Sequence, residues 1–183
     1  MTKRSSKISL LFVLTFVLLV MAFLYWRRSS SKVVLNTEIS GRVGPPELYP
    51  DPGTSSGAID PRVSQRNIAE TICTPGWTKT VRPPARITNT IKLEMMRARG
   101  VTDRSSYELD HIIPLELGGC PDCKENLWLE PYEPYPGARQ KDKVENYLHR
   151  QVCNGTLPLE EAQRAIVTDW YKIYLEISTS GRQ

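Results

Sequence analysis

The side chains best suited to chemistry are an acid and a base that adjoin in the sequence. The chain of 183 residues has two histidines, and one of them, His111, directly follows Asp110. A carboxylate oxygen is a hard ligand for Mg²⁺ or Mn²⁺, and a neutral imidazole is a capable general base near pH 7. On a regular strand the two side chains would point to opposite faces, so a local distortion must bring them to one site. The pair therefore needs support from other elements.

The Asp-His pair lies in a predicted antiparallel hairpin. Residues 107–113 are β-prone, and residues 126–129 are typical of a returning strand after a loop that contains Gly118-Gly119. An Asp-His pair on a first strand, Asn126 before a second strand and a helix beyond it resemble the HNH endonucleases, also called His-Me finger or ββα-metal nucleases. The resemblance covers about residues 107–153 and, more weakly, residues 71–77.

The resemblance implies a metal-dependent endonuclease that hydrolyses phosphodiester bonds of nucleic acid, with DNA the favoured substrate. Asp110 would hold a divalent ion, Mg²⁺ or Mn²⁺ with Zn²⁺ as the alternative, and His111 would deprotonate water. Asn126 would complete the catalytic set by bracing the hairpin through its side-chain amide. Such hydrolysis needs a cation to neutralise charge on the scissile phosphate and a base to activate water.

The family takes a further metal ligand from the helix after the second strand. Here the insertion 131–137 precedes a predicted helix over 138–152, where valine and leucine recur at four-residue spacing. Asp142 is the favoured ligand, because it lies early in this helix and offers an oxygen. Three residues further along the same helix are alternatives: Glu145, Asn146 and His149.

Charge is unevenly distributed along the chain. The formal net charge is +4, but six cations flank an N-terminal apolar run, so the global charge does not argue for nucleic-acid binding. Residues 76–104 contain seven basic and two acidic side chains, whereas residues 105–136 contain seven acidic side chains and one lysine. The first run can grip phosphates and the second can hold a cation, although a solvated surface explains either. The expected phosphate-binding residues are Arg82, Arg86, Arg139 and Lys143.

The four cysteines allow several states. Cys120 and Cys123 have the Cys-x-x-Cys spacing of a zinc half-site, a redox pair or a local disulfide, while Cys73 and Cys153 form no second pair in sequence. We expect disulfides Cys73–Cys153 and Cys120–Cys123, with reduced thiols or zinc as alternatives. A thiol oxidoreductase is disfavoured because the βαβ context of such motifs is missing.

The N-terminal part predicts a membrane anchor. Residues 8–26 contain no charge and would span about 28 Å as a helix, and no cleavage pattern follows them. We therefore expect a basic N-terminus over 1–7, a transmembrane helix over 8–26 and a flexible Pro/Gly/Ser-rich tether over 27–67. The nuclease-like domain would occupy 68–178, with a tail over 179–183, and the even cysteine count favours a domain outside the cytoplasm.

The expected fold class is α+β: a small ββα-metal, HNH-like hairpin-plus-helix core with flanking helices, preceded by one N-terminal transmembrane helix. The flanking helices are predicted over 86–99 and 158–177, where apolar residues recur at helical spacing. We expect a monomer that binds nucleic acid and the membrane. The competing hypothesis is a catalytically inactive, membrane-anchored binding module of the same fold.

Overall fold

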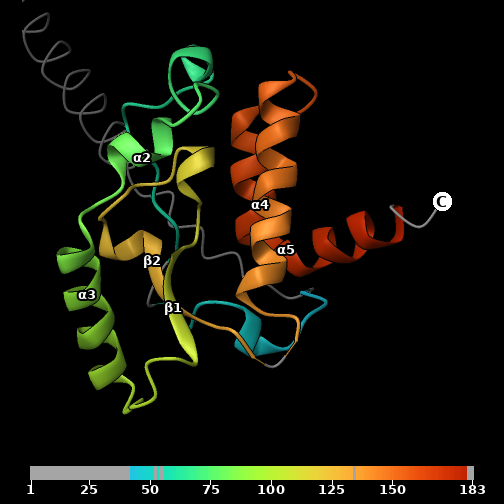
Figure 1. Cartoon of the computed structure of the whole chain (residues 1–183). Coiled ribbons are helices and arrows are strands. Elements are labelled where there is room, and N and C mark those ends of the chain that lie inside the picture. Colours follow the sequence, from blue (N-terminus) through green and yellow to red (C-terminus); the bar gives the residue numbers. More distant parts are fainter. Residues whose placement is uncertain (1–41, 52, 54–55, 134, 181–183) are drawn as a thin grey trace, which may run out of the picture. The chain divides into compact units, whose positions relative to one another are not determined.

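The computed structural model describes residues 42–51, 53, 56–133 and 135–180, and within them it contains four α-helices and a two-stranded sheet (Figure 1). The α+β part of the expected fold class is therefore correct. Short 3₁₀ turns, labelled η, lie between the longer elements. The chain order is η1 (Pro46–Leu48), η2 (Ile68–Glu70), α2 (Trp77–Val81), α3 (Ala85–Ala98), β1 (Tyr107–His111), η3 (Leu115–Leu117), η4 (Lys124–Asn126), β2 (Leu127–Pro131), α4 (Ala138–Cys153) and α5 (Leu159–Ser180).

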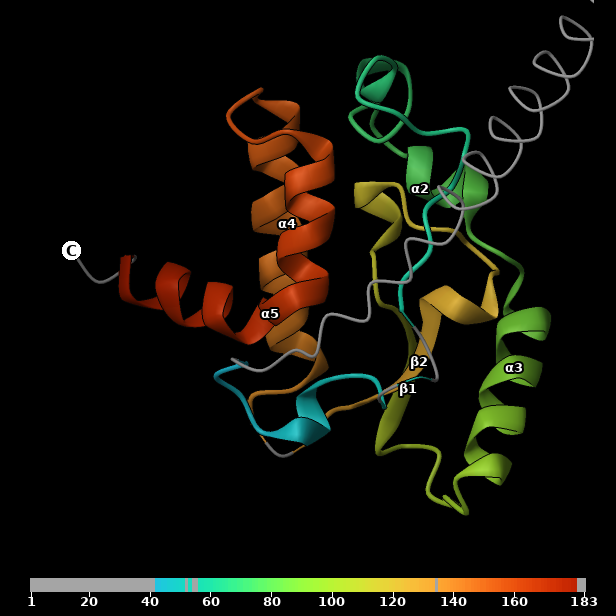
Figure 2. The ribbon, with the colours of Figure 1, turned by 180° about the vertical axis from the view of Figure 1, so that it is seen from behind.

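The predicted hairpin is confirmed. Strands β1 and β2 pair in antiparallel register, with Glu108 opposite Glu130 and Asp110 opposite Trp128. Opposed residues share a face and residues two apart along a strand do too, so Glu108, Asp110 and Glu130 lie on one face. Both views place α3 on one side of the hairpin and α4 with α5 on the other (Figures 1 and 2).

The predicted helices over 86–99, 138–152 and 158–177 correspond to α3, α4 and α5, with ends displaced by up to three residues. In the core, α4 packs along α5 through a buried stripe of Val144, Leu148 and Val152. Burial of such side chains contributes roughly 1.5–3 kcal/mol each. Because α5 continues to Ser180, the expected tail does not begin at 179.

Helix α5 is kinked at Asp169, whose backbone is not helical (φ −161°, ψ 80°). The Asp169 carboxylate accepts hydrogen bonds from the Tyr49 hydroxyl (2.6 Å), the Val43 N–H (2.9 Å) and the Lys172 N–H (3.0 Å). The last of these caps the second half of the helix, as an aspartate at a helix start does. Figures 1 and 2 show this second half turning away from α4.

The segment expected to be a flexible tether is packed against the domain over much of its described length. Leu48 and Tyr49 are 1% and 5% exposed, and Val63 is also buried in the same core. Isolated apolar residues among prolines and glycines have no period, so the sequence did not reveal this burial. Residues 27–41 of the expected tether lie outside the described residues.

The expected membrane architecture is corrected. Across the ranges described above, no helix is long and apolar enough to cross a bilayer. Helix α5 has 22 residues, but charged side chains such as Glu160, Arg164 and Lys172 recur along it. The expected basic N-terminus and anchor, residues 1–7 and 8–26, lie outside the described residues. The transmembrane helix in the fold class and the single-pass localisation are accordingly withdrawn.

Candidate functional site

A polar cleft of about 110 Å³ opens beside the end of β1. Four stretches of chain contribute to it: α2 with its C-terminal cap, the end of β1, the turn around η3, and the second turn of α4. Asp110 and His111 both line this cleft, which is the convergence that the sequence required of them. The lining residues are Thr78, Arg82, Asp110, His111, Pro114, Leu115, Glu116, Glu145 and Asn146.

His111 is 6% exposed and lies 2.9 Å, through Nε2, from the carbonyl oxygen of Pro121. A carbonyl can only accept, so this contact assigns the ring proton to Nε2 and leaves Nδ1 as the basic nitrogen. Burial lowers the pKa of His111, and the Arg82 charge lowers it further, against the opposing effects of Pro121 and Asp110. The imidazole is therefore neutral near pH 7, as a general base must be.

Asn126 is fully buried and makes the bracing contacts expected of it. Its Oδ1 accepts from the Ile113 N–H (2.9 Å) and the Ala58 N–H (3.3 Å), and its Nδ2 donates to the carbonyls of Ile113 (2.9 Å) and Cys120 (3.0 Å). The loop passes so close that a Cβ on Gly119 would lie 1.8 Å from the Ile113 oxygen. Glycine is required there to let the loop fold over Asn126.

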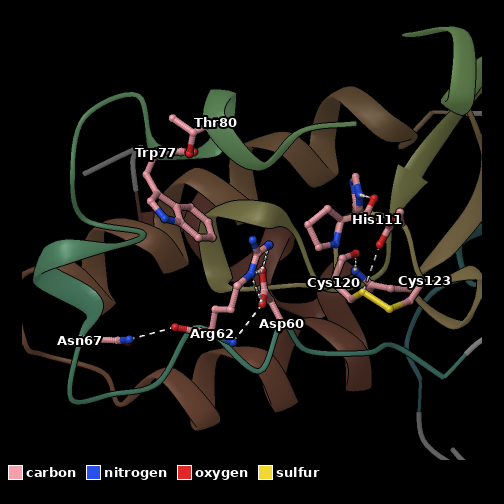
Figure 3. A network of polar contacts seen from close by, with 11 residues as sticks. Asp60, Arg62, Asn67, Trp77, Thr80, His111, Cys120 and Cys123 are labelled. Carbon is pink, nitrogen blue, oxygen red and sulfur yellow. Dashed lines mark hydrogen bonds and ion pairs between the residues drawn. A yellow bond between two sulfur atoms is a disulfide. The ribbon is translucent and has the colours of Figure 1, made fainter. Parts of the chain in front are cut away.

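Residues 57–60, expected within the tether, run alongside this loop. Cys120 donates its N–H to the Ala58 carbonyl (2.8 Å), and Asp60 donates its N–H to the Gly118 carbonyl (2.8 Å). Asp60 is 2% exposed, and its carboxylate pairs with Arg62 at 2.6 Å, which lowers the Asp60 pKa (Figure 3). The loop behind His111 is thus held from outside the hairpin.

Both expected disulfides are present. Cys73–Cys153 joins the segment before α2 to the end of α4, across a sequence separation of 80, and Cys120–Cys123 closes the loop that carries Pro121. Figure 3 shows the His111 ring beside the Cys120–Cys123 disulfide. Because all four sulfurs are bonded to each other in pairs, neither pair offers a thiolate to zinc.

A buried lysine from α4 lies against the acidic face of the hairpin. Lys141 is 2% exposed, and its ammonium contacts Asp110 (2.5 Å), Glu130 (3.6 Å) and Glu145, and donates to the His111 carbonyl (2.9 Å). Burial alone would lower the Lys141 pKa, but the three carboxylates raise it well above its usual value. Lys141 is therefore a fixed cation in the site.

The carboxylates around Lys141 differ in their proton affinity. Burial would raise the pKa of Asp110, but the Lys141 ammonium holds it well below its usual range. Burial raises the pKa of Glu145 to about 8 and that of Glu130 well above its usual value, and the Asp110 charge adds to both shifts. Both Glu130 oxygens are buried without a hydrogen-bond partner. Glu145 and Glu130 therefore bind a proton more tightly than exposed carboxylates do.

Side chains that can hold a metal ion lie at this face. One carboxylate oxygen each from Glu108, Asp110 and Glu130 lie within 4.8 Å of one another. The all-oxygen donor set fits a hard divalent cation. The Lys141 ammonium already compensates part of this negative charge, so an added cation would share or displace that contact.

The structure brings two of the four candidate helix ligands to the cleft. Glu145 and Asn146 line it, whereas the favoured Asp142 is exposed and does not. Asp142 lies three and four residues before these two cleft residues. His149 Nε2 instead contacts the Ile72 carbonyl at 2.9 Å, outside the cleft.

Only one of the four expected phosphate-binding residues lines the cleft. Arg82 does, from the C-terminal cap of α2. Arg86 is exposed on α3, and Arg139 is exposed in the first turn of α4. Lys143 borders a second groove between α4 and the end of α5. These three residues are near the Asp-His motif in sequence, but they do not line the cleft.

Sequence reasoning missed four charged residues of the site: Lys141, Glu108, Glu130 and Glu116. Lys141 lies three residues before Val144 on the buried stripe of α4, and that position was the available signal. Glu130 faces the same side as Asp110 by strand alternation. Glu116 lines the cleft from η3, and burial raises its pKa.

The chain matches no family model, no curated protein and no solved structure.

Proposed function

We propose that the protein is a metal-dependent endonuclease of the HNH type that hydrolyses phosphodiester bonds of nucleic acid at the cleft of Asp110 and His111. The observation that carries this proposal is the state of His111. Its Nε2 is engaged by a backbone carbonyl, its Nδ1 is left to accept a proton, and an acid and a guanidinium line the same cleft. An acid, a base and a cationic group around one small cleft suit phosphodiester hydrolysis.

The residues of this chain take distinct roles in the proposal. His111 Nδ1 accepts the proton of the attacking water, and burial keeps the ring neutral for that step. Arg82, which lines the same cleft, offers N–H donors to the phosphate oxygens. Asn126 keeps the loop closed behind His111 without touching the substrate.

The donor set suits a divalent cation held by Asp110, with Glu108 and Glu130 offering carboxylate oxygens within 4.8 Å and with Glu145 and Asn146 of α4 lining the same cleft. Such an ion would neutralise charge on the scissile phosphate and on the leaving oxygen. Lys141 keeps Asp110 ionised, as a metal ligand must be. Mg²⁺ or Mn²⁺ is favoured over Zn²⁺ because the donors are oxygens.

A non-catalytic binding module is the second candidate, and the Lys141 contact favours it. The ammonium pairs with Asp110 at 2.5 Å, so the acidic cluster is compensated by the chain's own cation. In that case Arg82 and the cleft would bind a phosphate group without cleaving it. Cleavage separates the two candidates.

The test is a cleavage assay of the purified full-length protein on plasmid DNA and on RNA, with Mg²⁺, Mn²⁺, Zn²⁺ or chelator. His111→Ala is expected to lose about 10²–10⁴-fold in turnover while still binding the ion. Asp110→Asn is expected to lower turnover and to weaken ion binding. His149→Gln is the control for the second histidine, which does not itself line the cleft although its Nδ1 lies 3.9 Å from Glu116.

Cleavage by the wild type that chelator abolishes supports the endonuclease. Full turnover by His111→Ala would rule out the proposed base. If the wild type cleaves neither polymer with any of the ions, the binding module replaces the endonuclease.

A further inference from the structure

The orientation of His111 depends on a very short piece of chain. The Pro121 carbonyl that accepts from Nε2 belongs to the loop Cys120-Pro121-Asp122-Cys123, which the Cys120–Cys123 disulfide closes into a ring. Pro121 is buried, whereas Asp122 is exposed to solvent. The carbonyl is therefore presented from a loop that has no strand or helix of its own.

The rest of the loop is held at its two ends and not at Pro121. Cys120 is anchored by its N–H to Ala58 and by its carbonyl to the Asn126 amide, and the Cys123 carbonyl accepts from the Asn126 N–H at 2.9 Å. Between these anchors, the disulfide is the covalent constraint on the path of Pro121.

We propose that the Cys120–Cys123 disulfide is the positioning element of His111: it fixes the Pro121 carbonyl, which in turn fixes the tautomer and the ring orientation of the base. The proposal rests on the proposed function in assigning His111 as that base. A carbonyl bonded to one ring nitrogen is a common way of selecting the tautomer of a working histidine. The two cysteines and Pro121 are positioning residues and do not touch the substrate.

The second disulfide supplies a matched control. Cys73–Cys153 closes a far longer loop, and the stabilisation by a disulfide increases with loop length in the chain-entropy description. Cys73→Ser/Cys153→Ser is therefore expected to lose more thermal stability than Cys120→Ser/Cys123→Ser. Only Cys120→Ser/Cys123→Ser is expected to change the tautomer and ring orientation of His111. If both disulfides were purely structural, the variant that loses less stability would not be the one that alters His111.

The direct readout is the nitrogen spectrum of the histidine rings of the full-length, ¹⁵N-labelled protein. The chain has two histidines, so His149→Gln assigns the remaining signal to His111. Wild type and Cys73→Ser/Cys153→Ser should show the Nε2-protonated tautomer alone. Cys120→Ser/Cys123→Ser should show exchange between both tautomers. Retention of the single Nε2-protonated form in that variant would overturn the proposal.

Reversible reduction repeats the test without a folding risk to the Cys120–Cys123 pair. In Cys73→Ser/Cys153→Ser the remaining disulfide is Cys120–Cys123, and dithiothreitol reduces it to two thiols while being oxidised to its cyclic disulfide. The second tautomer should appear on reduction and vanish when oxidised glutathione restores the bond. An unchanged spectrum throughout would count against the proposal.

Kinetics distinguish this inference from the proposed function. With bis(p-nitrophenyl) phosphate and Mn²⁺, Cys120→Ser/Cys123→Ser should lose about 10²-fold in kcat with KM unchanged, since a misplaced catalytic group costs about that much. Unchanged kcat in an active enzyme would refute the positioning role. If the wild type is inactive with every ion but the tautomer still depends on the disulfide, the endonuclease fails and the positioning of His111 stands.

Discussion

Replacement of Lys141 by methionine tests the electrostatic account of the site most directly. Methionine keeps the length of the side chain and removes the charge. The wild-type ammonium is 2% exposed and contacts Asp110 at 2.5 Å and Glu130 at 3.6 Å. Without it, the Asp110 carboxylate loses the cation that keeps it ionised in a largely buried position. Loss of one partner of a buried ion pair costs about 3–5 kcal/mol.

We therefore expect Lys141→Met to lower the free energy of unfolding by about 3–5 kcal/mol at pH 7. Lys141→Met/Asp110→Asn also removes the Asp110 charge but leaves Glu130 and Glu145 without the ammonium, so it should recover only part of that loss. Urea denaturation of the wild type, both single variants and the double variant measures the coupling. Lys141→Arg is the control that retains a cation.

The dependence on pH has a definite sign. In the wild type Asp110 has a depressed pKa, so its contribution to stability is present above its unfolded pKa and is lost as pH falls through the folded value. In Lys141→Met the Asp110 pKa should rise, because burial is no longer opposed. The deficit of the variant should then shrink as pH falls from 7 towards 5. A loss below about 1 kcal/mol at pH 7, within the range of exposed ion pairs, would refute this reasoning.

Three further predictions concern single residues. Burial raises the pKa of Glu130 above its ordinary value of 4.5, so the folded state takes up a proton and the free energy of unfolding falls as pH rises above 4.5. Glu130→Gln should flatten this dependence on pH in urea denaturation from pH 5 to 9. An unaltered slope would contradict the prediction. Asn126→Ala leaves buried backbone groups unpaired, at a cost of about 1–3 kcal/mol each. Thermal denaturation should therefore show a large loss of stability, while metal binding persists. Unchanged stability with lost metal binding would reverse the roles assigned to Asn126 and Asp110. Asp169→Ala removes the cap of the second half of α5 and should cost about 0.5–2 kcal/mol in chemical denaturation, whereas Glu160→Ala, at an exposed position, should change little.

Local pattern was sufficient for the hairpin and the helices. Strand alternation and the glycine loop predicted β1 and β2, and a four-residue apolar period predicted α4, because these elements express their period in the sequence itself. The loop role of Asn126 also followed from its place before β2. Its side-chain amide forms four hydrogen bonds, with two backbone N–H groups and two backbone carbonyls.

The identity of the helix residues at the cleft was decided by tertiary packing. The sequence predicted that Asp142 and Glu145 share nearly one face of the helix, since helical geometry determines which residues lie together. It could not say which turn would lie level with Asp110. Packing of Val144 and Leu148 against the core sets that position, and it leaves Asp142 in solvent.

Long-range contacts also decided what the composition had suggested wrongly. Pro- and Gly-rich residues before Ile68 indicated a tether, yet Leu48, Tyr49 and Val63 are buried, because burial depends on partners far along the chain and not on local period. Lys141 is the clearest case. A lysine in a charged run is ordinarily solvated, and only the three-dimensional meeting of α4 with the acidic face of the hairpin makes it a buried cation at the site.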